Sequence, residues 1–116
     1  MQKINLFEEA KKLKKTDATG TTNLLTADQF SIEVRVHQPK HKPRLHTCSQ
    51  DEFIYALEGV VDMLVDGQEF LLNEGESVLI PAGVRHKTMT REGSSWMLVS
   101  KEPHEHKNFE RGDPIE

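Results

Sequence analysis

The stretch that decides how this chain is interpreted is His46-Thr47-Cys48-Ser49-Gln50-Asp51-Glu52, together with the β-rich run Phe53–Leu57 that follows it. His46, Cys48 and Glu52 fall at even offsets, so on an unbroken strand their side chains share one face. Imidazole nitrogen, thiolate sulfur and carboxylate oxygen are the ligand types that proteins offer to zinc and first-row metals. The stretch therefore predicts a metal site on a strand.

A fourth donor follows later in the chain. His86 comes directly after the turn Pro81–Gly83, at the start of a further β-rich run, where an adjacent ladder would bring it opposite the first three donors. A carboxylate that points into a barrel costs several kcal/mol unless it is paired or bound to a metal. We expect the four donors to converge inside a barrel, although each is also compatible with a half-buried polar residue on a strand.

Period-two patterns surround this stretch. Phe30, Ile32, Val34 and Val36 alternate with polar residues, which predicts a strand buried on one face, and another strand is expected near Leu45. The later predicted strands are 53–57, 60–65, 69–72, 77–80, 86–89 and 96–100. Short strands with glycine and proline at their turns predict an all-β sandwich or barrel.

The two ends of the chain differ from this pattern. Residues 5–15 predict a short helix, because Asn5 and Glu8 match a capping box and an apolar stripe follows. Small polar residues at 16–22 predict a linker. We therefore divide the chain into an N-terminal helix and linker at 1–29, a barrel at 30–101 and a polar C-terminal tail at 102–116.

Composition excludes several classes of protein. The 116 residues suit one domain, and 15 Lys and Arg against 19 Asp and Glu give a net charge of -4, which argues against nucleic acid or an anionic membrane as partner. Neither a signal peptide nor an apolar run of about 18 residues is evident, so we expect a cytoplasmic protein. Cys48 is the only cysteine, which rules out an intrachain disulfide.

At its metal-ligand residues the sequence resembles the cupin superfamily, over about residues 30–101. The residues that keep the spacing of the first cupin motif are His46, Cys48, Glu52 and Gly59. Those that keep the spacing of the second motif are Gly75, Pro81, Gly83 and His86. The resemblance implies a double-sheet barrel of six to eight strands, also called a jelly roll or double-stranded β-helix, that is commonly a homodimer. It also implies a divalent metal ion (Zn, Fe, Ni or Mn) held by the motif histidines and glutamate.

The chain departs from the family pattern at three positions. Lys40 stands in place of the first glycine, Thr90 in place of the final asparagine and Cys48 in place of the second histidine. If Cys48 binds, two His, one Cys and one Glu suit zinc, or iron in a softer field. If it does not, the 2-His-1-carboxylate composition of non-haem iron sites remains. A degenerate, metal-free cupin is the third possibility.

Other residues are weaker candidates. His104-Glu105-His106 lies in the polar tail and is expected to be an exposed bystander, whereas His37 and His41 flank the first motif and are candidates for the rim of the site. Ile54 and Ala56 lie at even offsets from Glu52, so their side chains are expected to face the cavity. Phe53, Tyr55 and Leu57 lie at odd offsets and point to the other face of the strand, where they are expected at a sheet or dimer interface. Trp96 is expected in the core.

The sequence leaves three functions open, because a fold does not determine a reaction. The first is a metal-dependent enzyme, of the dioxygenase or isomerase and epimerase type, acting on a small polar molecule. The second is a non-catalytic module that binds a small ligand or regulates, since no residue outside the metal set stands out as an acid or base. The third is a structural or interaction role.

Overall fold

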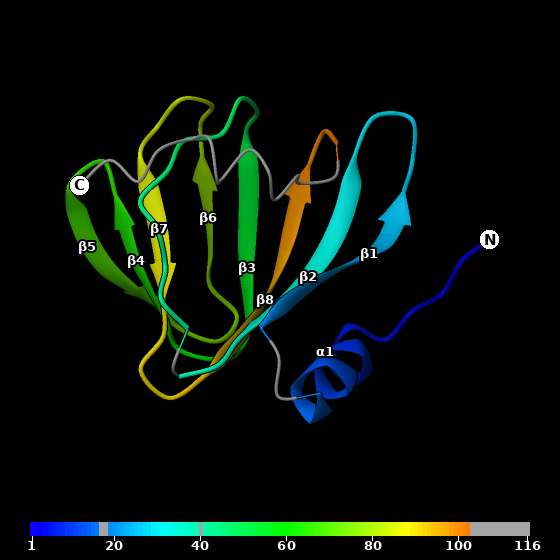
Figure 1. Cartoon of the computed structure of the whole chain (residues 1–116). Helices are drawn as coiled ribbons and strands as arrows, with labels where there is room; N and C mark the ends of the chain where they lie inside the picture. Colours follow the sequence, from blue (N-terminus) through cyan, green and yellow to red (C-terminus); the bar gives the residue numbers. More distant parts are fainter. Residues whose placement is uncertain (17–18, 40, 103–116) are drawn as a thin grey trace.

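The chain folds into two antiparallel β-sheets with one short helix on the outside (Figure 1). The computed structural model describes residues 1–16, 19–39 and 41–102. One sheet has the strand order β1-β2-β8-β3-β6, and the other has the order β5-β4-β7. The elements are α1 (Leu6–Lys15), β1 (Gly20–Thr26), β2 (Ser31–His37), β3 (Glu52–Gly59), β4 (Val61–Val65), β5 (Gln68–Leu72), β6 (Ser77–Ile80), β7 (His86–Met89) and β8 (Ser94–Ser100). The predicted all-β double-sheet fold with an N-terminal helix is confirmed.

Helix α1 forms where the capping signal predicts it. The Asn5 side-chain oxygen accepts a hydrogen bond of 3.0 Å from the backbone N–H of Glu8, which satisfies one of the donors left over at a helix start. Ala10 is fully buried, and Leu6 and Leu13 pack beside it. The apolar stripe of the helix therefore faces the sheet.

The strands predicted from residue 53 onward are all present, each within two residues of its predicted bounds. Two expectations for the earlier part of the chain are wrong. Residues 20–26 form β1, paired antiparallel with β2, and not a linker. Among the described residues near Leu45 no strand forms, and His46 pairs with His86 through an isolated bridge.

Strand β2 is buried on both faces, which corrects the prediction of a single buried face. Val34 and Val36 pack toward helix α1, in agreement with the alternation. The polar positions of the opposite parity are buried as well, because they face the interior of the barrel: Ser31 and Glu33 have no exposed surface, and His37 is 7% exposed. The sequence pattern distinguishes apolar from polar positions, but it does not show that a polar face can be enclosed.

Two hydrophobic clusters lie on opposite sides of the five-stranded sheet. The inner core joins the two sheets and consists of Ile54, Ala56, Val61, Met63, Leu72, Ile80, Trp96 and Leu98. The outer core lies between this sheet and helix α1 and consists of Ala10, Val34, Val36 and Leu57. Ile54 and Trp96 lie in the inner core as predicted. Ala56 is buried there too, but it does not line the cavity between the sheets, and the helix of the same chain covers Leu57.

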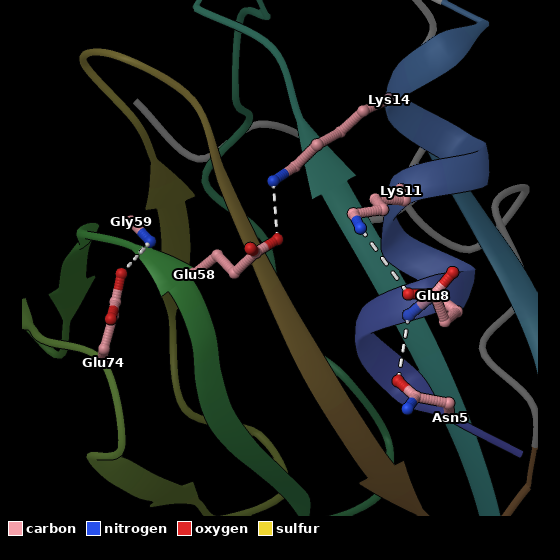
Figure 2. A network of polar contacts seen from close by, with 7 residues as sticks. All are labelled: Asn5, Glu8, Lys11, Lys14, Glu58, Gly59 and Glu74. Carbon is pink, nitrogen blue, oxygen red and sulfur yellow. Dashed lines mark hydrogen bonds and ion pairs between the residues drawn. The ribbon is translucent and has the colours of Figure 1, made fainter.

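An ion pair connects helix α1 to the end of β3 (Figure 2). Lys14 Nζ lies 2.7 Å from Glu58 Oε1, and both side chains are more than one third exposed. In the next residue, the Gly59 N–H donates to Glu74 Oε2 at 3.0 Å. Of these two contacts only the ion pair touches the helix, and because it is exposed, burial in the outer core supplies most of the stabilisation of α1.

The described residues contain no helix that is long and apolar enough to cross a membrane. The predicted polar tail begins at residue 102, and His104-Glu105-His106 lies outside the described residues.

Candidate functional site

A small cavity of about 20 Å³ lies inside the barrel, between the two sheets. This volume accommodates about one water molecule or one ion. Its lining residues are Arg35, His46, Glu52, Ile54, His86, Thr88, Trp96 and Leu98. Three of the four donors predicted from the sequence, His46, Glu52 and His86, therefore line the same cavity.

Backbone pairing brings the two motif histidines together. The His46 N–H donates to the His86 carbonyl at 3.0 Å, and the His86 N–H donates to the His46 carbonyl at 2.9 Å. Their ring centroids are 4.3 Å apart. The segment after residue 40 thus crosses to β7 in the second sheet before the chain returns to β3 (Figure 1).

Both rings are oriented by the backbone two residues earlier. His46 Nδ1 lies 2.8 Å from the Arg44 carbonyl oxygen, and His86 Nδ1 lies 2.9 Å from the Val84 carbonyl oxygen. A carbonyl oxygen only accepts, so each Nδ1 carries the proton, and the lone pair of the neutral ring is on Nε2. The same arrangement fixes ring tautomers around metal ions in proteins.

Glu52 contacts His86 directly. His86 Nε2 lies 2.8 Å from Glu52 Oε1, and both side chains are almost completely buried. Two lone pairs at this distance repel each other, so the contact is favourable only when a proton or a metal cation is shared between the two atoms. Two ligands bound at about 2.1 Å to one cation, at right angles, are also about 3 Å apart.

The donor chemistry fits a divalent cation, with two imidazoles and a carboxylate around one cavity. Among the described residues, however, no three His, Cys, Asp or Glu side chains are gathered into a ready metal-binding group.

Arg35 is a cavity residue that the sequence reasoning missed. Burial lowers the pKa of its guanidinium, and the negative charges of Glu33, Glu52 and Cys48 oppose that shift. Arg35 thus places a positive charge beside the Glu52 carboxylate within the same cavity. The sequence feature that could have identified Arg35 is the alternation of polar and apolar residues over 31–37. This alternation points to a cavity residue only when the polar face of the strand is known to face inward.

Cys48 is partly exposed and does not line the cavity. The prediction that it shares a face with His46 and Glu52 assumed an unbroken strand, but β3 begins only at Glu52. The Cys48 carbonyl instead accepts a hydrogen bond of 2.8 Å from the Gly83 N–H. In this structure, Cys48 therefore contributes its backbone to the position of the turn before His86.

His37 and His41 lie at the rim, where the sequence made them candidates. Their ring centroids are 3.9 Å apart, and the His37 ring packs edge-on against Trp96 at 4.4 Å. Burial, followed by the neighbouring charges of His41 and Arg35, lowers the pKa of His37 to about 3. His37 is therefore neutral at physiological pH.

The family comparison agrees with this geometry. Residues 31–91, more than half of the chain, match the cupin domain family, and the match includes all three donors of the cavity. The chain belongs to the cupin family. The matched region lies within the barrel segment predicted at 30–101.

Solved structures give the same fold for this cupin. A protein from Thermus thermophilus is 21% identical, with a TM-score of 0.74, and the match covers 87% of this chain and 97% of that one. A cupin-2 domain protein from Shewanella frigidimarina is 24% identical, with a TM-score of 0.68 and coverage of 87% and 94%. A polyketide cyclase from Streptomyces resistomycificus is 22% identical, with a TM-score of 0.63 and coverage of 69% and 62%. No curated protein matches the sequence.

Proposed function

We propose that this cupin binds a divalent metal ion with His46, Glu52 and His86 and acts on a small polar molecule beside it. The observation that carries the proposal is that these three donors line one buried cavity while the backbone holds both imidazoles by Nδ1. Oriented rings lose little entropy when their Nε2 atoms bind a cation. A family-wide tendency to bind metals is consistent with this proposal but does not select Zn, Fe, Ni or Mn.

The cavity walls suit such chemistry. Ile54, Trp96 and Leu98 provide an apolar wall, which excludes water and strengthens the electrostatic interactions of the polar residues. Thr88 and Arg35 lie in the same lining and offer a hydroxyl and a positive charge to a bound molecule. When bound, a divalent metal ion polarises a ligand oxygen as a Lewis acid. An enzyme with this site would be of the dioxygenase or of the isomerase and epimerase type.

A second candidate function is a metal-free module that binds a small ligand. The position of Arg35 favours it, because a fixed positive charge beside Glu52 compensates the buried carboxylate without a metal. In that case the His86–Glu52 contact would hold a proton instead of a metal ion.

Metal content distinguishes the two candidates. We expect elemental analysis of the purified protein to find about one divalent ion per chain, and calorimetric titration of chelator-treated protein to give a saturable isotherm. Replacing Glu52 with Gln removes an anionic ligand and should weaken metal binding at least about tenfold. Glu69→Gln is the matched control, because Glu69 is exposed on β5.

Circular dichroism would establish that each variant is folded before metal binding is compared. Absence of metal from the purified protein together with no titratable binding would reject the metal proposal and leave the metal-free module. Equal affinities of the wild type and Glu52→Gln would show that the metal binds elsewhere.

A further inference from the structure

A larger pocket of about 280 Å³ opens beside the cavity, and we call it the entrance pocket. Its walls come from the start of β1, the end of β2 and the crossing segment 41–46. It shares Arg35, His46 and Thr88 with the lining of the cavity. A molecule bound in the entrance pocket would therefore contact the residues that border the proposed metal site.

The lining of the entrance pocket is positively charged in a chain whose net charge is -4. Arg35 lies where the pocket meets the cavity, and Lys42 and Arg44 are exposed at its outer edge. No Asp or Glu among the described residues contributes to the lining. Within the described part of the chain, no acidic side chain forms an ion pair with Lys42 or Arg44.

The same pocket contains a buried polar atom without a partner. His37 is 7% exposed, and its Nδ1 has no hydrogen-bond partner among the described residues. A buried polar group in this condition costs free energy that a ligand hydrogen bond can recover. Because His37 is neutral, it offers a hydrogen bond and not a further positive charge.

We propose that the entrance pocket binds the carboxylate or phosphate group of a small organic anion, with Lys42 and Arg44 as the residues that recognise its charge. Guanidinium and ammonium groups are the side chains that bind these anions, and a pocket of this volume suits a small metabolite. The inference rests on the proposed function in one respect, since it takes the neighbouring cavity as the place where the other end of the molecule would react.

Trp96 provides a direct readout. It is the only tryptophan of the chain, it contacts the His37 ring, and it lines the cavity. We would titrate chelator-treated, metal-free protein with succinate, with inorganic phosphate and with butane-1,4-diol, which has the length of succinate without its charge. A saturable change of Trp96 fluorescence is expected with at least one of the two anions and not with the diol, and added NaCl should weaken it. The anion that binds more tightly distinguishes a carboxylate site from a phosphate site.

Substitutions then locate the binding. Lys42→Gln and Arg44→Gln should each raise the Kd of the anion about five- to tenfold, because each removes one partly screened charge. Arg91→Gln is the matched control, since Arg91 is exposed and pairs with Asp62 outside this pocket, and it should leave the Kd unchanged.

The proposal is overturned if the diol binds as well as both anions, if neither anion binds, or if both rim variants bind like the wild type. These outcomes do not depend on the metal proposal. Anion binding by a protein that takes up no metal would reject the metal site and keep the entrance pocket. Metal uptake without anion binding would reject the entrance pocket as an anion site and keep the metal site.

Discussion

His46 and His86 are joined by two backbone hydrogen bonds, so the two imidazoles are placed by the main chain before any ligand is considered. Each ring is then oriented by a carbonyl of its own segment. Either ring can therefore be replaced without removing a backbone hydrogen bond of the bridge. Cys48 lies only two residues after His46 but does not line the cavity, and this position leads to the first prediction.

Cys48 should behave as a cysteine outside the cavity. It is partly exposed and does not line the cavity, so we expect iodoacetamide to alkylate it at the same rate in metal-loaded and chelator-treated protein. Cys48→Ser should leave the metal stoichiometry unchanged. Protection by metal, together with loss of metal in Cys48→Ser, would instead add the thiolate to the ligand set, as the spacing of the sequence predicts.

The outer core should contribute far more stability than the ion pair beside it. Leu57→Ala removes a buried side chain that packs with Ala10 and should lower the free energy of unfolding by about 2–5 kcal/mol. Glu58→Gln removes only the exposed ion pair with Lys14 and should cost less than about 1 kcal/mol. Urea denaturation of the two variants measures both values. Similar losses would mean that the ion pair, and not burial, holds helix α1 in place.

His37 should make the protein less stable in acid. Its pKa is about 3 in the folded chain against an ordinary value of 6.5, so between these values the unfolded chain binds a proton that the folded chain does not. The free energy of unfolding should fall by about 1.4 kcal/mol per pH unit from this group as pH decreases below 6.5. His41 acts in the same direction, because burial and Arg35 lower its pKa too.

The variant His37→Gln tests this dependence. Between pH 7 and pH 5 the wild type should lose about 2 kcal/mol more than the variant. Urea denaturation at pH 7, 6 and 5 gives the free energy of unfolding of both proteins as a function of pH. The comparison uses the slopes of the two curves, so a loss of stability in the variant that is the same at every pH does not affect it. Parallel curves would show that His37 titrates normally in the folded protein.

The outer face of the five-stranded sheet carries an apolar row that helix α1 leaves partly exposed. Ile32 lies opposite Val99, Val99 opposite Phe53, and Phe53 opposite Leu79, which is 61% exposed. We predict that two copies of the chain associate through this row. The motivation differs from the sequence argument, because Tyr55 and Leu57 pack in or against the outer core of their own chain.

Light scattering at micromolar concentration should give the mass of two chains for the wild type and of one chain for Leu79→Asp. Leu71→Asp is the control, because Leu71 is similarly exposed but lies on β5 in the other sheet, and it should remain dimeric. A monomeric wild type would rule out the association at that concentration. Dissociation in the Leu71→Asp variant would place the interface on the three-stranded sheet.

The later strands and the cupin motifs could be predicted from sequence because their signals are local. Period-two alternation, with turns such as Asp66-Gly67, fixes strands within a few residues, and the spacing of His46, Glu52 and His86 carries the site. Asp66 and Gly67 both have positive φ, as such a turn requires. These features depend on residues that are close in the chain.

The predictions that were wrong or missed have a common physical cause, which is packing between segments that are distant in the sequence. Residues 20–26 form a strand because they pair with β2, although their composition alone resembles a linker. Arg35 lines the cavity because helix α1 covers the opposite face of β2 and turns this polar face inward. The expected strand near residue 45 is replaced by one bridge because the chain there crosses from one sheet to the other.

The presence of two cores on opposite sides of the five-stranded sheet separates what this protein can change from what it must keep. Val34 and Val36 anchor β2 against the helix, whereas Glu33, Arg35 and His37 project from the reverse of the same strand into the interior. A library randomised at these three inward positions would vary the chemistry of the interior and leave the outer-core residues of β2 unchanged. The fold thereby offers a route to new specificities, in evolution or by engineering, through one strand.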